Sequence, residues 1–426
     1  MKVYLDTIGC RLNQSEIESM ARQFRAAGHE IVPAATEADM AVVNTCSVTS
    51  QAAADSRRVI RNAARAGVDE IIATGCWATL QPKDAANLPN VLHVVDNTHK
   101  DTLVPQQLNL PLEAFNLEPI VREPLPGLRH RTRAFIKVQD GCNNHCTFCI
   151  TTVARGDGMS LPVKDVLADV QSALDGGAKE IVLTGVHLGS WGQEWNTHLR
   201  ELVKAILTDT DTPRLRLSSL EPWDLDTDFF RLWDDKRLCQ HLHLPIQSGC
   251  ASTLKRMARK NTPASFRNLV TAARKIMPDV AITTDVIAGF PGETDDEFSE
   301  SLAFIKEIDF AGGHAFTYSP RPGTAATRLG GQTKHDVRKE RNAVLREVFE
   351  MGAEAYRERF IGQKVSVLWE SASEFNGDGW LMQGLTGNYL RVKAFSEQAL
   401  WNEISTARIQ EPDLNGLKAI ILNRDP

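Results

Sequence analysis

The sequence lacks the features that would place the chain in a membrane or outside the cell. In its 426 residues, no segment reaches the roughly 18 consecutive apolar residues of a membrane-spanning helix. The first residues, Met1 to Asp6, lack the apolar run and the small-residue cleavage site of a secretion signal. We therefore expect no membrane association and a place in the reducing cytoplasm, where the eight cysteines keep free thiols that can bind metal.

An excess of positive charge is also lacking. Lysine and arginine number 48 against 54 acidic residues, and the formal net charge is −6. This balance excludes a uniformly basic nucleic-acid binder, although local basic patches can still contact phosphates. With 42% hydrophobic residues, a chain of this length can bury several cores and predicts about two to four domains.

A fourth cysteine is missing from the most informative motif of the chain. Residues 141–149 read Gly-Cys-Asn-Asn-His-Cys-Thr-Phe-Cys, which spaces Cys142, Cys146 and Cys149 as CxxxCxxC. Three thiolates can hold three irons of a four-iron cluster and leave the fourth iron open, whereas electron carriers close the cluster with a fourth cysteine. Structural zinc prefers paired CxxC units or cysteine and histidine sets, and a disulfide framework needs an even count. The motif predicts chemistry at a cluster; the alternative is three incidental cysteines.

The first third of the sequence alternates short apolar runs with helix-like stretches. Runs at 3–6, 40–44 and 70–74, with helices expected at about 15–27 and 52–66, are typical of a parallel sheet. A cysteine follows each run within a few residues, namely Cys10, Cys46 and Cys76. Ligand sites gather outside the carboxyl ends of parallel strands, so these thiols could meet and hold a second cluster. The alternative is that each is a small buried hydrophobic residue.

The central block predicts a full or partial parallel barrel. Six strands are expected, each followed by a polar or glycine-rich turn: 134–138, 180–184, 215–219, 241–245, 281–286 and 314–319. A proline-rich stretch within residues 103–131 marks a domain connection before this block. After it come a charged helix at 334–359 and a segment of short strands from Gly362, for which a small antiparallel barrel fits best.

Together these motifs resemble the radical S-adenosylmethionine methylthiotransferase family, nearly from end to end. The resemblance rests on Gly9-Cys10, Asn44-Thr45-Cys46, Gly75-Cys76 and the central cysteine motif. Two stretches, Gly9 to Glu16 and Phe316 to Thr324, are similar to the branch that acts on threonylcarbamoyladenosine beside the tRNA anticodon.

The resemblance implies an α/β chain of three domains. Their expected bounds are residues 1–115 for a methylthiotransferase domain with an open parallel sheet, 128–358 for a partial (β/α)6 radical barrel, and 360–426 for a small antiparallel TRAM-like barrel.

It also implies the chemistry. Cys142, Cys146 and Cys149 would hold a [4Fe-4S] cluster whose open iron binds S-adenosylmethionine, and Cys10, Cys46 and Cys76 a second cluster that delivers sulfur. The product would carry a methylthio group on C2 of the adenine. A cofactor-borne radical suits this unactivated aromatic carbon, because it offers no leaving group. The implied partners are the tRNA anticodon loop and a reductant such as flavodoxin or ferredoxin.

Further cofactor contacts follow from the resemblance, each beside a structural alternative. Phe148 would pack on the adenine or belong to a core, Gly185 and Val186 would offer backbone groups, and Gln247 and Ser248 would contact the ribose or methionine or make turn hydrogen bonds. Arg155 would face the cofactor carboxylate or form a surface pair.

The chain departs from the family pattern in two places. Ser160-Leu161 stands where relatives commonly carry Ser-Arg, and Cys250 where many carry Ser. Cys250 and Cys239 are expected to be buried rather than to bind metal. Rival functions are methylthiolation of isopentenyladenosine in tRNA or of a ribosomal-protein aspartate, and, from another class, a non-catalytic iron-sulfur or RNA-binding protein.

Contacts with RNA have the least support in the sequence. From Phe360 onward there are six basic residues against eight acidic ones, so a local cluster around Arg391 and Lys393 is the candidate there. Two further basic groups could contact phosphates or be solvated surface: Arg57, Arg58, Arg61 and Arg65, and Arg129, His130, Arg131 and Arg133.

Overall fold

The computed structural model describes residues 1–111, 115, 132–374 and 379–424. The chain divides into two compact units, of which the first comprises residues 1–144 and 150–186, and the second residues 145–149 and 187–426. Of the basic group expected at 129–133, Arg133 alone falls among the described residues.

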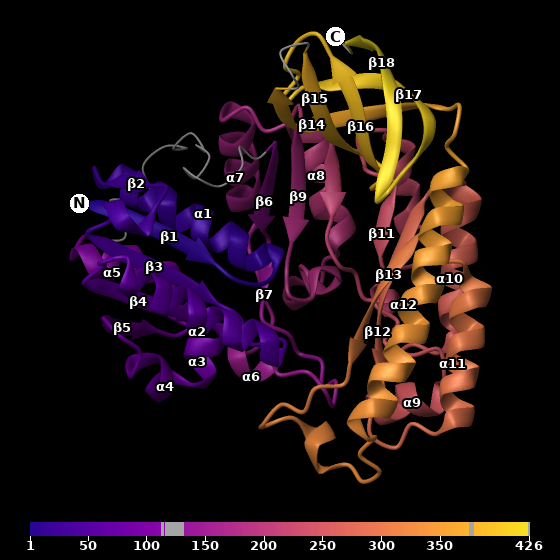
Figure 1. Cartoon of the computed structure of the whole chain (residues 1–426), viewed down its shortest axis with the longest axis horizontal. Helices are drawn as coiled ribbons and strands as arrows, with labels where there is room; N and C mark the ends of the chain where they lie inside the picture. Colours follow the sequence, from indigo (N-terminus) through magenta and orange to yellow (C-terminus); the bar gives the residue numbers. More distant parts are fainter. Residues whose placement is uncertain (112–114, 116–131, 375–378, 425–426) are drawn as a thin grey trace. The chain divides into compact units, whose positions relative to one another are not determined.

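The first unit begins with a five-stranded parallel sheet in the order β2-β1-β3-β4-β5 (Figure 1). Its strands are β1 (Lys2–Thr7), β2 (Glu30–Val32), β3 (Met40–Thr45), β4 (Glu70–Gly75) and β5 (Val91–Val95). Its helices are α1 (Arg11–Ala26), α2 (Ser50–Arg65), α3 (Cys76–Leu80), α4 (Pro82–Ala86) and α5 (Leu103–Leu108). The three strands and two helices expected here are confirmed.

Helices cover both faces of this sheet because successive strand residues point to opposite sides. Val42 of β3 packs into a core with α1 and α5, while its neighbours Ala41 and Val43 pack with α2 and α3. The strand is buried along its whole length. Continuous burial explains why β3 reads as an unbroken apolar run rather than an alternating one.

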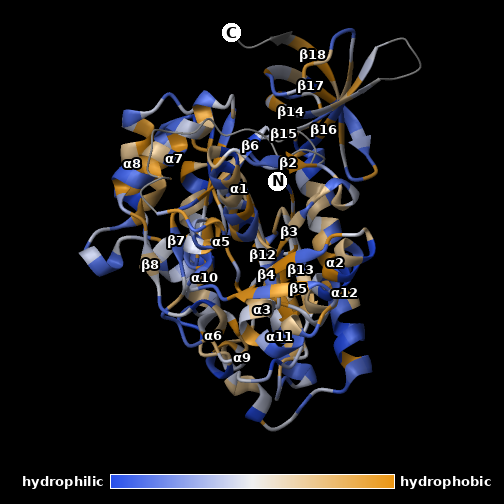
Figure 2. Cartoon of the chain, turned by 90° about the vertical axis from the view of Figure 1, so that its left-hand side faces the viewer, coloured by the Kyte–Doolittle hydropathy of each residue, from blue (hydrophilic) through white to orange (hydrophobic). Residues whose placement is uncertain are grey.

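The rest of the first unit carries the start of the central block. Strands β6 (Arg133–Lys137) and β9 (Glu180–Thr184) pair in parallel, and β7 (Gln139–Asp140) pairs antiparallel with β8 (Met159–Ser160). Two helices complete it, α6 (Thr151–Arg155) and the amphipathic α7 (Val163–Asp175), on which Figure 2 shows hydrophilic and hydrophobic residues mixed.

The second unit contains the remaining four strands of the central block. Strands β11 (His241–His243), β12 (Ala281–Ala288) and β13 (Gly312–Thr317) form a parallel sheet, and β10 (Leu215–Leu217) is joined to the β11 region by isolated bridges. Helices α10 (Pro263–Ile276), α11 (Asp295–Ile308) and α12 (His335–Glu358) lie beside this sheet (Figure 1); α8 (Leu199–Asp209) and α9 (Ala251–Arg256) precede them. All six predicted strands of the block are therefore present.

The chain ends in a closed barrel of five strands in the order β14-β15-β16-β18-β17. The strands are β14 (Lys364–Glu374), β15 (Trp380–Thr386), β16 (Arg391–Ser396), β17 (Ile404–Asp413) and β18 (Gly416–Arg424). Four pairings are antiparallel as expected, but β16 and β18, which close the ring, run parallel. Residues such as Val367, Trp369, Met382 and Val392 fill the interior.

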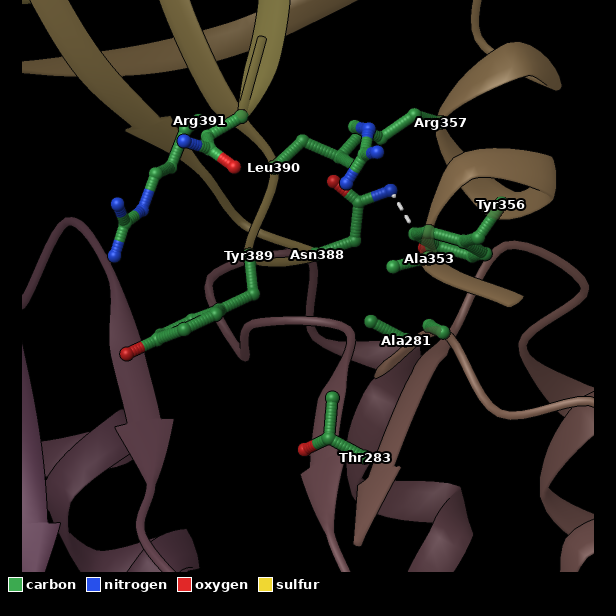
Figure 3. Close-up of a pocket in the computed structure, with 11 residues that line it drawn as sticks. Ala281, Thr283, Ala353, Tyr356, Arg357, Asn388, Tyr389, Leu390 and Arg391 are labelled. Carbon is green, nitrogen blue, oxygen red and sulfur yellow. Dashed lines mark hydrogen bonds between the residues drawn. The ribbon is translucent and has the colours of Figure 1, made fainter. Parts of the chain in front are cut away.

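A turn of this barrel docks on the base of the central strands within the second unit. Arg216 of β10, fully buried, donates to the carbonyl oxygens of Thr386 (3.1 Å) and Gly387 (3.0 Å). Tyr389 of the same turn stacks on His241 with ring centroids 4.4 Å apart. Next to it, Asn388 donates to the Tyr356 hydroxyl at 2.9 Å, beside a cavity of about 160 Å³ (Figure 3).

Within the described ranges, no helix combines the length and the apolar character needed to cross a membrane.

Candidate functional site

Three cysteines of the first unit lie at one edge of its sheet. Cys10 caps the start of α1 directly after β1, Cys46 follows β3, and Cys76 opens α3 directly after β4. Since these three strands are adjacent and parallel, their carboxyl ends meet. A side chain on Gly9, whose φ is +114°, would put its Cβ 2.8 Å from the sulfur of Cys46. Cys46 and Cys76 are buried and Cys10 is exposed.

Two asparagines hold the thiols of this trio. The Cys10 thiol donates to Oδ1 of Asn13 at 3.7 Å. Asn97 donates through Nδ2 to the sulfur of Cys76 at 3.6 Å and to the carbonyl oxygen of Ala154, in α6, at 2.7 Å. The trio is therefore tied to the helix that follows the central cysteine motif in the sequence.

A buried charge network lies beside the trio. The Glu16 carboxylate receives hydrogen bonds of 2.8 Å from Lys100 and from Arg155, and each of these three side chains is 2% exposed. Arg155 also donates to Asp140 at 2.9 Å and to Oδ1 of Asn13 at 2.8 Å. Burial alone would raise the pKa of Glu16, but Lys100 and Arg155 outweigh it and hold that pKa well below its usual range.

Arg155 brings positive charge to the three thiols. Burial, together with the neighbouring Cys10 and Cys76, raises the pKa of the Cys46 thiol to about 11, and Arg155 opposes this rise. A buried guanidinium near three thiols favours their anionic form, which is the form that binds iron. Arg155 is thus no surface pair; its predicted contact with the cofactor carboxylate stays a prediction.

The chemistry of the trio fits an iron-sulfur cluster. Among the described parts of the chain, no three cysteine, histidine or carboxylate side chains are close enough together to hold one metal ion. An iron-sulfur cluster binds each thiolate through a different iron, so its ligands need not approach one another as closely. Three thiols, a nearby cation and one exposed side are compatible with such a group.

The first end of the central motif is braced in the first unit. The backbone nitrogen of Cys142 donates to the carbonyl oxygen of Gly156 at 3.1 Å, and that of Asn144 donates to the Cys142 sulfur at 3.4 Å. Gln139, 1% exposed, donates through Nε2 to the carbonyl oxygens of Asp140 and Gly141. A Cβ on Gly185 would lie 2.9 Å from the Gln139 side-chain oxygen. The glycine at this turn therefore leaves room for the Gln139 side chain.

The second end of the motif is anchored in the second unit. The Thr147 backbone nitrogen donates to the carbonyl oxygen of Met257, and Cys149 to that of Cys146, both at 3.0 Å. Arg259 lies 3.9 Å from the sulfur of Cys146 and pairs with Glu221 at 2.6 Å. Burial raises the pKa of the Cys146 thiol to about 11 although the nearby Arg259 opposes this rise.

Other predicted contact residues have structural partners as well. Phe148 packs edge-to-face on Phe290, with centroids 6.5 Å apart, at the margin of a small core. Ser248 is 1% exposed and accepts from the Cys250 backbone nitrogen at 3.2 Å, as a turn residue does. Gln247 has a φ of +71°, and its backbone exchanges hydrogen bonds with β12. Val186 is partly buried at the end of β9. The assignment of these residues, and of the six cysteines, stays a prediction.

Several residues that shape the two sites were missed by sequence reasoning: Asn13, Glu16, Asn97, Lys100, Gln139, Glu221 and Arg259. Asn13 and Glu16 lie inside the stretch Gly9 to Glu16 that carried the branch resemblance, which was a usable signal. Lys100 had none, because one lysine after a strand looks like ordinary surface. The burial expected for Cys239 and Cys250 is confirmed.

The basic residues expected to contact RNA have different surroundings in the structure. Lys393 is paired with Asp413 at 2.6 Å, whereas Arg391 lines the cavity of Figure 3. The four arginines of α2 include Arg58, paired with Asp55, and Arg57, which lies over the Trp77 ring. Arg129, His130 and Arg131 lie outside the described residues.

Comparisons with known proteins agree with this geometry. Residues 2–96 match the model of the uncharacterized protein family UPF0004, and residues 136–305 that of the radical SAM superfamily. The chain is 37% identical to threonylcarbamoyladenosine tRNA methylthiotransferase MtaB of Thermotoga maritima, over 91% of the chain and 89% of that protein. With the protein of the same name from Bacillus subtilis it shares 36% identity, over 92% and 89%.

More distant relatives share the architecture. The chain is 32% identical to tRNA-2-methylthio-N(6)-dimethylallyladenosine synthase of Bacillus licheniformis, over 88% of the chain and 77% of that protein. Among solved structures, it is similar in fold to the radical S-adenosylmethionine methyltransferase TsrM from Kitasatospora setae, with a TM-score of 0.58, 14% identity and 76% of each chain covered.

Proposed function

We propose that this chain, which belongs to the radical S-adenosylmethionine tRNA methylthiotransferase family and to its MtaB branch, adds a methylthio group to C2 of N6-threonylcarbamoyladenosine in tRNA. The modified base lies beside the anticodon, so the anticodon loop is the part of the tRNA that enters the site. A flavodoxin or ferredoxin supplies electrons, and the enzyme acts in the cytoplasm.

One observation carries the proposal. Three thiols that are far apart in the sequence stand at the carboxyl ends of adjacent strands, next to a buried arginine from the helix after the cysteine motif. An electron carrier closes each of its clusters with four cysteines, whereas a set of three leaves one iron open for chemistry. Transfer of sulfur further requires a second place from which sulfur is delivered.

We assign one [4Fe-4S] cluster to Cys142, Cys146 and Cys149 and a second to Cys10, Cys46 and Cys76. When bound, S-adenosylmethionine and the clusters supply the radical that activates C2, the sulfur atom and the methyl group. The protein residues hold the geometry. Arg155 and Asn13 orient the second trio, and Arg259 and Gln139 fix the two ends of the central motif.

The cofactor contacts and domain bounds are parts of the same proposal. We assign contacts with S-adenosylmethionine to Phe148, Gly185, Val186, Gln247 and Ser248, and to Arg155. We place the domains at residues 1–115, 128–358 and 360–426.

The proposal is tested by reconstituting the full chain anaerobically and supplying a reductant, S-adenosylmethionine and an anticodon stem-loop that carries threonylcarbamoyladenosine. Mass spectrometry of the digested RNA should detect the methylthio nucleoside. Formation of 5′-deoxyadenosine without any modified nucleoside, on this RNA, would overturn the assigned substrate. Absence of 5′-deoxyadenosine from protein with its full iron content would overturn the radical chemistry itself.

A further inference from the structure

The sheet β11-β12-β13 has one buried face and one partly open face. Along β12, Ile282, Thr284 and Val286 are buried, while Thr283, Asp285 and Ile287 between them are partly exposed. The buried face packs toward the helices; a Cβ on Gly313, for example, would meet the Phe349 ring of α12. The alternation means that the other face is turned away from the helical layer and left accessible.

Polar side chains occupy this open face, which is unusual for the middle of a parallel sheet. We call His243, Thr283, Asp285, His314 and Phe316 the inner-face cluster. His243 contacts Thr283 Oγ1 through Nδ1 at 2.9 Å and Asp285 through Nε2 at 3.2 Å. Asp285 and His314 are register neighbours on β12 and β13, and the His314 ring lies 6.2 Å from that of Phe316.

Two features of the cluster indicate a ligand. Oδ1 of Asp285 is a buried acceptor that has no hydrogen-bond donor among the described residues. Leaving a charged acceptor unpaired away from water costs about 1–3 kcal/mol or more, so a donor from a ligand is expected there. Phe316 is 40% exposed although it lies within a strand, and therefore offers a free aromatic surface.

The base of the open face is covered. Tyr389, from the β15–β16 turn, stacks on His241 at the beginning of β11, and Figure 3 shows this turn above Ala281 and Thr283 at the beginning of β12. A ligand therefore enters from the carboxyl ends of the strands, where barrel enzymes keep their sites.

We propose that the inner-face cluster binds the threonylcarbamoyl group on N6 of the substrate adenosine and selects it over a hydrocarbon substituent; this inference rests on the proposed function. The hydroxyl and N–H groups of threonylcarbamoyl are donors for Asp285, and its carboxylate is an acceptor for an imidazole N–H group of His314. His243, whose two ring nitrogens contact Thr283 and Asp285, holds the Asp285 carboxylate in place. Phe316 stacks on the adenine.

Selectivity follows from the cost of unpaired polar groups. An isopentenyl group would displace water from Asp285 and His314 without replacing its hydrogen bonds. Sites built to hydrogen-bond a substrate reject analogues that lack the partner by factors as large as about 10⁴, whereas an apolar pocket discriminates far less.

The test compares the affinities of the holoenzyme for three anticodon stem-loops of one sequence, carrying threonylcarbamoyladenosine, isopentenyladenosine or unmodified adenosine. The variants are Asp285→Asn, which keeps the size and shape of the side chain, and His314→Phe, which keeps a planar ring but has no N–H group. Asp296→Asn, on the exposed surface of α11, and His335→Phe are the matched controls. We expect the preference for threonylcarbamoyladenosine over isopentenyladenosine to fall at least about tenfold in the first two variants and to stay at the wild-type value in the controls.

The outcomes separate the two proposals. If the wild type prefers threonylcarbamoyladenosine and both cluster variants keep that preference, the inner-face cluster does not read the substituent, and the proposed function stands. If the wild type binds all three RNAs equally, the proposed function itself loses its support. Thr283→Val serves as a further variant in case the first two impair folding, because it removes one hydroxyl without changing any charge. It should also reduce the preference for threonylcarbamoyladenosine over isopentenyladenosine.

Discussion

Single residues in the first unit depend on one another through charge. Glu16 is the shared partner of two buried cations, Lys100 and Arg155, and is linked to the Cys10 thiol through Arg155 and Asn13. Removing one member of such a network leaves the others charged and without water, which is more costly than never having built the network. The network therefore fixes the geometry beside the cysteines more firmly than any of its members does alone.

Replacing Glu16 by Gln should destabilise the first unit by about 3 to 5 kcal/mol, because Lys100 loses its countercharge inside the protein. Chemical denaturation of the full chain measures this loss. Glu37→Gln, at an exposed position, is the matched control and should change the free energy of unfolding by less than about 0.5 kcal/mol. Equal effects of the two substitutions would show that the network contributes no stability.

The same carboxylate predicts a pH dependence. Its pKa in the folded chain lies below the ordinary value of 4.5, so its contribution to stability is fully present above that value and is lost progressively as the pH falls towards the folded pKa. Between pH 6 and pH 3, the difference in unfolding free energy between wild type and Glu16→Gln should therefore shrink. A difference that grows with acidity would contradict the assigned charge state.

Arg259 provides a residue-scale prediction in the second unit. It pairs with Glu221, lies 4.4 Å from the Trp223 ring centroid and is 3.9 Å from the Cys146 sulfur. A lysine can neither donate two parallel hydrogen bonds to Glu221 nor stack a planar group on Trp223. Arg259→Lys should therefore reduce 5′-deoxyadenosine formation about 10- to 100-fold. Arg267→Lys, in an exposed pair with Glu307, is the control and should retain the wild-type rate.

At the scale of elements, the ends of strands carry the chemistry. β1, β3 and β4 each end at a cysteine, and the order of the strands places the three ends side by side. The helices that follow β1 and β4 begin at or directly after those cysteines, so the start of each helix fixes the position of its cysteine at the sheet edge.

Replacing Cys10, Cys46 and Cys76 together by Ala should lower the iron content of the reconstituted chain from about eight to about four atoms. Insertion of sulfur should be abolished, while cleavage of S-adenosylmethionine remains measurable. Iron analysis and electron paramagnetic resonance check the first point. Cys239→Ala, a buried cysteine away from both trios in the sequence, should leave the count at about eight; an unchanged count in the triple variant would refute the second cluster.

The elements also show which parts of the fold can be predicted from the sequence. The six central strands were predictable because each is a short apolar run followed by a turn. β5 was missed because it is an edge strand with His93 and exposed Leu92 in its middle, which breaks the apolar run. The parallel pairing of β16 and β18 was unpredictable, since no local pattern encodes which strands meet.

The candidate site likewise has features that could be predicted from the sequence and features that could not. The placement of Cys10, Cys46 and Cys76 at one edge of the sheet was predictable, because each follows a short apolar run in the sequence. The role of all six cysteines as cluster ligands stays a prediction. The contacts of Arg155 with Glu16 and Asn13 were not predictable, because these residues lie more than a hundred positions away, and the sequence alone offered a surface pair or a cofactor contact.

On the scale of the whole second unit, one turn joins the terminal barrel to the central strands. Arg216→Ala removes two charged hydrogen bonds to the turn and should lower the stability of this junction by about 3 kcal/mol. Calorimetry of the full chain should then resolve a separate, earlier transition for the barrel. Arg408→Ala, on β17, is the control and should leave the transition as it is in the wild type; a single unchanged transition in Arg216→Ala would refute the role of the turn.

The parallel pairing of β16 with β18 closes the terminal barrel into a ring. A ring of strands has no unpaired border, so another chain cannot lengthen the sheet by adding a strand of its own. Any partner of this domain must therefore be recognised by side chains and loops. The closed ring also removes one surface through which newly synthesised chains could aggregate.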